Sequence, residues 1–357
     1  MSVLAAIGVL ALLIVVHELG HFAAARLQGI YVNRFSLGFG PVLLRYQGAM
    51  TEYAVRAFPL GGYVGFPDDD PESDIPANDP NLLRNRPVLD RAIVISAGVI
   101  ANLVFAYFLL VGQVATVGFQ EIQAGLVISQ VQPNSAAMAA GIQVGDLIQT
   151  LNGQTLPIYP QATEQFIQTV TTSPGRPLTV QLQRNGEILS TTLTPQEDPQ
   201  GEGKIGVALV PHIQVQRASN LLSALKDGAN AYERVVKLTV QGFWQLISNF
   251  SESAGQVAGP VKIVEYGASI AQSNLGNLFQ FGALISINLA VINILPLPAL
   301  DGGQLLFLLI EGLFGKPLPN KIQEGIMQTG LVLLLGLGVV LIVRDTVNLA
   351  IVQEFFR

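Results

Sequence analysis

The stretch VLALLIVVHELGHFAAARL, residues 9–27, decides how this chain can fold. It is apolar enough to enter a lipid bilayer, yet it contains His17, Glu18 and His21 within five positions. An Asp-like charge at the centre of a membrane helix costs at least about 2.5–3.5 kcal/mol, so such groups survive where they pair or bind something. The three residues therefore indicate a functional site inside a membrane segment.

The spacing of the two histidines predicts a metal site. On an α-helix, positions four apart differ by about 40° of rotation, so both imidazoles project from one face. They can then hold one ion at about 2.0–2.1 Å each. Glu18 is turned away from this pair but stays near enough to act on a water molecule. In zinc hydrolases with this pattern, the metal lowers the pKa of water toward about 7 and the glutamate takes the proton.

The composition is typical of a membrane protein. Hydrophobic residues make up 50% and charged residues 12% of the 357 positions, whereas ordinary soluble domains carry about 25% charge. The net charge of -6 argues against a nucleic-acid partner. Because the chain has no cysteine, a metal must be held by His, Asp or Glu.

Four apolar segments predict membrane spans, at residues 3–25, 92–118, 278–297 and 326–343. Arginines gather between the first two segments or at their edges, which places that connection in the cytoplasm by the positive-inside rule. Both termini and residues 119–277 then lie outside. A secretory signal peptide is the alternative for the first segment, but no Lys or Arg precedes its apolar run.

The first connection predicts a β-hairpin, formed by PVLLRY (41–46) and TEYAVRAF (51–58) between glycines. The acidic stretch at 68–80 that follows predicts a solvated loop. Residues 219–250 have the period of an amphipathic helix, which either lies at the membrane interface or packs on the membrane domain.

Residues 124–197 predict a compact α+β unit. A strand at 125–131 and a short helix closed by Gly141 come first. A strand ending at Asn152-Gly153, a helix over 160–170 and a hairpin over Asn185-Gly186 follow. The pieces resemble a PDZ module, in which Gly-Leu-Val-Ile at 125–128 corresponds to the peptide-groove strand. Such a module captures an extended peptide at an exposed strand edge.

A catalytic zinc site needs a third protein ligand and one open position. Asp301, in NILPLPALDGG (293–303), follows the third apolar segment at its cytoplasmic end, on the same side as the two histidines. Pro296 and Pro298 interrupt the helix there, so a carboxylate can be offered from irregular backbone packed inside protein. An N-cap for the next helix is the alternative role for Asp301. His212 is suitable by type but lies in the outer region.

H-E-L-G-H in the first segment and N-x-x-P-x-P-x-L-D-G-G near the third resemble the site-2 protease family of intramembrane zinc metalloproteases. Further elements resemble that family: Phe39 between two glycines, Gly98 with Asn102, and Gly259-Pro260. The resemblance covers nearly the whole chain. A single PDZ module is inserted as in the bacterial envelope-stress branch, whereas some relatives carry two.

The resemblance implies a multi-pass α-helical membrane protein with about four transmembrane helices, a membrane-associated β-hairpin and an inserted α+β PDZ-like domain. We expect residues 1–118 to hold the first two spans and the hairpin, and 119–212 to form the PDZ-like domain. Residues 213–277 are then a helical, amphipathic linker, and 278–357 contain the last two spans.

The resemblance also implies residue roles. His17, His21 and Asp301 would bind zinc, and Glu18 would be the general base. Asn102 and Asn293 would be supporting residues near the site, serving either a substrate backbone or a helix contact.

The implied activity is hydrolysis of peptide bonds within or near transmembrane segments of membrane proteins. Anti-sigma factors or remnant signal peptides would fit as substrates, the PDZ groove would bind a peptide, and an earlier cut by another protease would come first. The hairpin at 41–58 would offer an edge to unwound substrate. The inner (plasma) membrane is expected, with a thylakoid or plastid membrane as the alternative.

Two other classes of function compete. A non-catalytic scaffold would bind peptides through the PDZ domain and keep zinc as a structural ion, but a structural site is normally closed by four protein ligands. A metal transporter would need ionisable residues along several spans, and the second span has none in 92–118.

Overall fold

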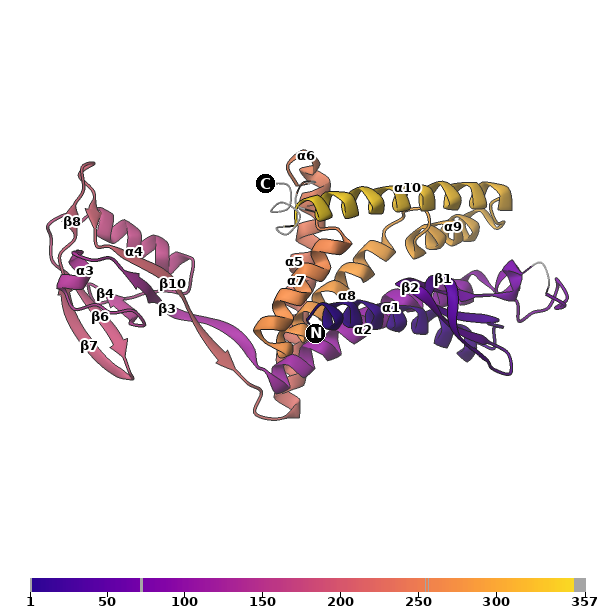
Figure 1. Cartoon of the computed structure of the whole chain (residues 1–357), viewed down its shortest axis with the longest axis horizontal. Coiled ribbons are helices and arrows are strands. Elements are labelled where there is room, and N and C mark those ends of the chain that lie inside the picture. The colour runs from indigo at the N-terminus through magenta and orange to yellow at the C-terminus, as the bar shows by residue number, and fades with distance from the viewer. Residues whose placement is uncertain (1, 71–72, 254, 256, 350–357) are drawn as a thin grey trace. The chain divides into compact units, whose positions relative to one another are not determined.

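The computed structural model describes residues 2–70, 73–253, 255 and 257–349. The chain divides into two compact units, one formed by Met1–Val117 with Ala218–Arg357 and the other by Gly118–Arg217. We call them the membrane unit and the inserted unit. Their elements are labelled in Figure 1.

Among the described residues, three helices are long and apolar enough to cross a membrane: α1 (Ser2–Leu27), α2 (Val88–Thr116) and the Lys321–Val347 part of α10 (Asn320–Val347). The predicted third span at 278–297 differs. It is α8 (Leu278–Ile294), an apolar helix of 17 residues that ends before Pro296. Irregular backbone follows until α9 (Asp301–Phe314) begins. The prolines explain the early end, because their rings cannot continue a helix.

Glycines allow α1 and α2 to pack closely. A Cβ added at Gly20 would lie 2.4 Å from the carbonyl oxygen of Ala97 on α2. The glycine of H-E-L-G-H is therefore a helix contact. On its other side α2 packs on α8 through a buried core of small and aliphatic residues: Ala106, Leu110, Ala283 and Ile287. The amide of Gln113 also donates to Gln280 across this interface at 3.4 Å.

Two further helices, α5 (Leu221–Ser248) and α7 (Pro260–Ser273), run across the direction of α1 and α2 (Figure 1). Tyr107 of α2 donates from its hydroxyl to the carbonyl oxygen of Leu225, and Gly228 lies against Val111. Toward the end of α5 and just beyond it, in the short helix α6 (Phe250–Ser253), large apolar side chains stay exposed: Leu238, Val240, Trp244, Ile247 and Phe250. Both expectations for residues 219–250 therefore have support, since the helix packs on α2 and keeps an apolar exposed surface.

The end of α10 is attached to the start of α7. Asp345 is 4% exposed, and its Oδ2 accepts a hydrogen bond from the backbone N–H of Lys262 at 3.1 Å. A Cβ at Gly259 would lie 2.4 Å from that oxygen. Gly259-Pro260 is thus explained locally: the glycine makes room for the carboxylate, and the proline occupies the first turn, where no N–H bond is lost.

The predicted hairpin is confirmed, but it is part of a larger sheet. Strands β1 (Arg34–Gln47) and β2 (Glu52–Gly65) each bend into two segments, with positive φ at Gly38, Gly40 and Gly61. Segment 42–47 pairs with 52–56, segment 52–55 also pairs with 34–37, and 34–37 pairs with 62–65. The order across the sheet is therefore 42–47, 52–56, 34–37 and 62–65, so that among the described residues the first and last segments are its edges.

The acidic stretch is less solvated than we expected. Asp68 accepts hydrogen bonds from the backbone N–H groups of Leu83 and Arg84, at 3.1 and 2.8 Å. Short 3-10 turns at Pro67–Asp69 and Leu83–Asn85 flank the connection, and Leu82 is 1% exposed. The carboxylate satisfies backbone donors at the second turn, which folds the loop back onto the unit; residues 71–72 lie outside the described part.

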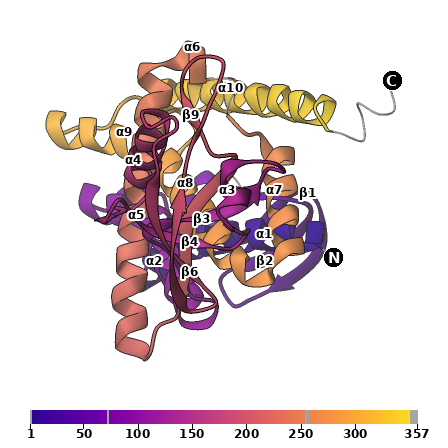
Figure 2. The ribbon, with the colours of Figure 1, turned by 90° about the vertical axis from the view of Figure 1, so that its left-hand side faces the viewer.

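The inserted unit contains a six-stranded sheet in the order β10-β3-β4-β6-β7, with β5 pairing to β4. Figure 2 turns this unit toward the viewer, with α3 and α4 beside the strands. Its elements are β3 (Phe119–Val131), α3 (Ala136–Ala139), β4 (Leu147–Leu151), β5 (Gln154–Thr155), α4 (Gln161–Thr171), β6 (Leu178–Arg184), β7 (Glu187–Leu193), β8 (Gln196–Glu197), β9 (Gly203–Lys204) and β10 (Val207–Gln216).

The predicted turns of this unit are confirmed. Ser135 caps α3 by accepting from the N–H of Met138, and Gly141 follows with φ +74°. The Asn152-Gly153 and Asn185-Gly186 pairs both adopt positive φ, as a two-residue hairpin turn requires. The assignment of 125–128 as the peptide-groove strand is wrong. These residues belong to β3, which lies between β10 and β4, so both of its edges are already paired, and the outer strands of the sheet are β10 and β7.

Candidate metal centre

Two imidazoles of α1 and a carboxylate of α9 meet in the membrane unit. His17 Nε2 lies 3.2 Å from His21 Nε2, and Asp301 Oδ2 lies 3.3 Å from His17 Nε2 and 3.5 Å from His21 Nε2. The three side chains are 12–15% exposed. We call these three atoms the donor triangle.

The donor triangle has the size that zinc requires. Ligand atoms at about 2.0–2.1 Å from a tetrahedral zinc are separated from one another by about 3.3–3.4 Å, and the three sides here are 3.2, 3.3 and 3.5 Å. Within the described part of the chain, Asp301 Oδ2 is buried and has no hydrogen-bond partner. A buried carboxylate oxygen without a donor is costly unless a cation satisfies it. The residues therefore fit a zinc ion.

The helix α2 orients both imidazoles. Val94 accepts from His21 Nδ1 through its carbonyl oxygen at 2.8 Å, which leaves Nε2 free as a lone-pair donor. Asn102 is fully buried, and its amide lies 3.4 Å from His17 Nδ1. Gly98 sits between these contacts, and a Cβ there would lie 2.3 Å from His21 Nε2 and 2.7 Å from His17 Cε1. Only a residue without a side chain fits at this position.

Asp301 is not the N-cap of α9. The N-cap is Leu300, and no side chain caps the helix there, so the alternative role of this carboxylate is excluded. Gly302 and Gly303 allow the helix to start directly on the preceding turn, because Cβ atoms at these positions would lie 2.1 and 2.3 Å from the carbonyl oxygens of Leu295 and Leu297. The two glycines thus bring the carboxylate back toward α1.

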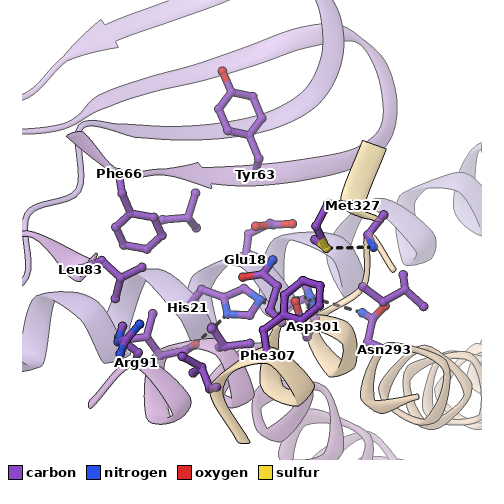
Figure 3. A pocket seen from close by; sticks show the side chains of 18 of the residues that line it. Glu18, His21, Tyr63, Phe66, Leu83, Arg91, Asn293, Asp301, Phe307 and Met327 are labelled. Atoms are coloured by element: carbon purple, nitrogen blue, oxygen red, sulfur yellow. Dashed lines mark hydrogen bonds and ion pairs between the residues drawn. The ribbon is translucent and has the colours of Figure 1, made fainter. Parts of the chain in front are cut away.

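A cavity of about 850 Å³ opens beside the donor triangle. Glu18 lines it from α1, and Figure 3 shows Glu18, His21 and Asp301 in the same space, beside the strand that carries Tyr63. The edge segment of the sheet lies against the glutamate, since a Cβ at Gly62 would be 2.9 Å from Glu18 Cγ. Tyr63 and Val64 of this segment also line the cavity.

The structure places both predicted asparagines against one histidine. Asn293 of α8 brings its amide nitrogen to 3.3 Å from His17 Nε2, on the donor triangle itself, whereas Asn102 faces the other ring nitrogen. His212 belongs to β10 of the inserted unit, where its Nδ1 lies 3.1 Å from the carbonyl oxygen of Ala124.

Several contributors escaped the sequence analysis. The carbonyl of Val94 has no sequence signal. Arg91 and Glu311, which also line the cavity, form an ion pair between α2 and α9. A signal did exist for Glu311, because it is the single charge in the apolar run 302–315.

The site and fold define a membrane metallopeptidase, and comparison with known proteins agrees. Residues 5–337 match Peptidase family M50. A protein of Synechocystis sp. that carries the name zinc metalloprotease is 72% identical over 99% of this chain and 97% of its own length. Membrane metalloprotease ARASP, chloroplastic, of Arabidopsis thaliana is 45% identical over 99% of this chain and 80% of its own length. Regulator of sigma-E protease RseP of Escherichia coli is 31% identical over 94% of this chain and 96% of its own length.

The chain belongs to Peptidase family M50. The resemblance to site-2 proteases is confirmed, and the protein is a zinc metalloprotease of a membrane. The scaffold and transporter alternatives are set aside.

Proposed function

We propose that the chain cleaves transmembrane segments of membrane proteins, with His17, His21 and Asp301 as the zinc ligands and Glu18 as the general base. The observation that carries this proposal is the donor triangle, in which two imidazole nitrogens and one unpartnered carboxylate oxygen lie 3.2–3.5 Å apart. Three protein ligands leave one position open, as catalytic rather than structural zinc sites do.

When bound, zinc supplies a Lewis acid that polarises the peptide carbonyl and makes water a better nucleophile. The chain's own residues do the rest. Glu18 takes the proton of the attacking water and returns it to the leaving nitrogen, in the manner of H-E-x-x-H peptidases. Asn293 is aimed at the same space and donates from its amide toward the substrate backbone. Asn102 also lines this space, but its amide lies 3.4 Å from His17 Nδ1, where it holds the His17 ring.

The substrate must be unwound before it can react, since its backbone is hydrogen-bonded within a helix. The sequence predicts that the hairpin at 41–58 receives the unwound strand, and Leu44 and Val55 lie in the two strands of this hairpin. That expectation is wrong for Val55, which pairs with Leu37 on one side and Leu44 on the other. The edge that lines the cavity is 62–65. In our proposal this segment pairs with the substrate and replaces its lost hydrogen bonds.

The inserted unit would bind a substrate before the membrane unit cleaves it. The outer strands of its sheet are β10 and β7, and β10 is the one that pairs with β3, so a peptide would add at β10 rather than at 125–128. We expect substrates such as anti-sigma factors or remnant signal peptides, already shortened by another protease. The host membrane would be a bacterial inner membrane, with a thylakoid or plastid membrane as the alternative.

The test is Glu18→Gln, compared with the wild type in zinc content and in cleavage of a single-span substrate in liposomes. We expect full zinc content and at least a 100-fold slower cleavage, consistent with the usual contribution of about 10²–10⁴-fold from a positioned acid–base group. Asp301→Asn should lose zinc as well as activity. Undiminished cleavage by Glu18→Gln, or full zinc affinity in Asp301→Asn, would contradict the proposed roles.

A further inference from the structure

Arg91 and Glu311 form a two-pronged ion pair inside the membrane unit. Arg91 Nη1 donates to Glu311 Oε2 at 3.0 Å, and Nη2 donates to Oε1. The remaining guanidinium nitrogen, Nε, donates to the carbonyl oxygen of Arg86 at 3.1 Å. Each side chain is 16% exposed. Two parallel hydrogen bonds between planar groups fix a relative orientation, which a single charge contact does not.

Arg91 shares a helix face with the residues that orient the imidazoles. It lies in the first turn of α2, and Val94, Gly98 and Asn102 follow at steps of three, four and four positions. Such steps keep residues on one face of a helix. This face of α2 therefore contacts both histidines of α1 and, about one turn earlier, carries the guanidinium of Arg91.

Glu311 shares a face of α9 with the metal ligand. Asp301, Gln304, Leu308 and Glu311 all line the same cavity. Ten positions separate the two carboxylates, which is about 15 Å along the helix axis. Because α9 packs mainly on α2, the ion pair joins the helix that supplies the third ligand to the helix that orients the other two.

We propose that Arg91 and Glu311 are positioning residues, whose ion pair holds α9 in the rotation and height that bring Asp301 to His17 and His21. Burial of apolar surface stabilises the association of helices without direction, whereas the two-pronged ion pair between α2 and α9 fixes a relative orientation. This inference rests on the proposed metal centre but concerns residues that do not touch the metal.

The first experiment measures the helix position without zinc. The chain has no cysteine, so spin labels on cysteines introduced at Leu89 of α2 and Leu313 of α9, which are 70% and 74% exposed, are unique. In metal-free full-length protein we expect a narrow distance distribution. Adding Glu311→Gln should broaden or shift it.

The second experiment measures zinc affinity by competition with a chelator. We expect Arg91→Met and Glu311→Gln to bind zinc about 10–100-fold more weakly, the usual effect of losing a residue that orients a ligand. The double variant R91E/E311R should recover most of the affinity. Arg91→Lys is the mildest change, because it keeps the charge but loses the two-pronged geometry. Its zinc affinity should lie between those of the wild type and Arg91→Met.

A matched control lies in the inserted unit, where Arg184 makes a two-pronged ion pair with Asp146. Asp146→Asn should leave the label distances and the zinc affinity unchanged. The proposal is overturned by unchanged distances, by single variants whose zinc affinity stays within twofold of the wild type, or by a charge exchange that recovers nothing. If the label distances change in Glu311→Gln but the wild type binds no zinc, the proposed metal centre is wrong. The proposal that the ion pair positions α9 is then still supported.

Discussion

At the scale of single residues, the metal centre depends on the missing side chain of a glycine as much as on the side chains of the donor triangle. Gly98 carries no side chain, and this lets α2 approach the two imidazoles within contact distance. A helix is normally destabilised by glycine. Here that cost is offset by a close approach that puts the Val94 carbonyl and the Asn102 amide on the ring nitrogens opposite the metal side.

We therefore expect Gly98→Ala to disturb the metal centre. The added methyl would meet both rings, and overpacking of this kind costs about 1–3 kcal/mol, which corresponds to about a 5- to 150-fold loss of zinc affinity. Chelator competition and a cleavage assay would measure the loss.

Gly336→Ala in α10 is the matched control, because an added Cβ there meets nothing within 4 Å. It should bind zinc like the wild type. Equal zinc affinity in Gly98→Ala and Gly336→Ala would show that the contact at Gly98 does not matter.

At the scale of elements, the bends in β1 and β2 decide which segment lines the cavity beside Glu18. A simple hairpin would expose 41–46 and 51–58. The turns at Gly38, Gly40 and Gly61 instead fold the two strands into four segments, with 34–37 in the interior and 62–65 next to Glu18.

Crosslinking would identify the segment that receives the substrate. In a Glu18→Gln background, a single cysteine replacing Tyr63 should form a disulfide with a cysteine placed near the scissile bond of a trapped substrate. A cysteine replacing Leu44, which is 69% exposed on the opposite edge, should give little product. Preferential crosslinking at position 44 would favour the outer edge and refute the assignment.

At the scale of the whole molecule, the inserted unit is built so that it can be removed. Its first and last strands pair along their length, from Phe119 opposite Gln216 to Val131 opposite Val207. The two chain ends of the unit are therefore adjacent, and a short Gly-Ser linker can replace residues 119–216.

This replacement tests whether the inserted unit selects among substrates. If the inserted unit excludes substrates that still carry a folded outer domain, the shortened enzyme should cleave both trimmed and untrimmed substrate. The ratio of the two rates, compared with the full chain, is the measurement. A shortened enzyme that still cleaves only the trimmed form would place the selection in the membrane unit.

The inserted unit should also be sensitive to acid. Burial raises the pKa of Asp146, but hydrogen bonds from Arg184 and from the N–H of Gln143 outweigh burial, so the pKa of this carboxyl lies below its ordinary value of 3.8. A group whose pKa is lowered by folding stabilises the fold above its unfolded pKa, and the contribution is lost as the pH falls through the folded value. We expect Asp146 to stabilise the unit at neutral pH and to lose this contribution as the pH falls from about 4 through its lowered pKa.

Hydrogen exchange of β4 and β6 in the full chain, corrected for intrinsic rates, would measure this loss. In Arg184→Met the buried carboxylate is left without its charged partner, which costs about 1–3 kcal/mol. Protection at neutral pH should then fall, and the acid transition should move to higher pH. An acid transition at the same pH in both proteins would contradict the assignment.

The sequence alone was sufficient to predict the local features of this protein. The periods and the Asn-Gly turns predicted the inserted unit. The H-E-x-x-H spacing placed His17, Glu18 and His21 on one helix, and the L-D-G-G motif pointed to Asp301. Such features depend on neighbours within a few positions, so the residues specify them directly.

Tertiary structure decided what depends on distant pairing. The sequence could not tell that 125–128 would be covered by β10, that Val55 would be interior, or that Arg91 would reach Glu311 across 220 positions. Strand order and helix packing follow from which surfaces the whole chain can bury together. A short motif therefore does not specify which distant segment it will contact. For the same reason the meeting of Asp301 with two imidazoles was a prediction from sequence, and only the folded chain gives the triangle its dimensions.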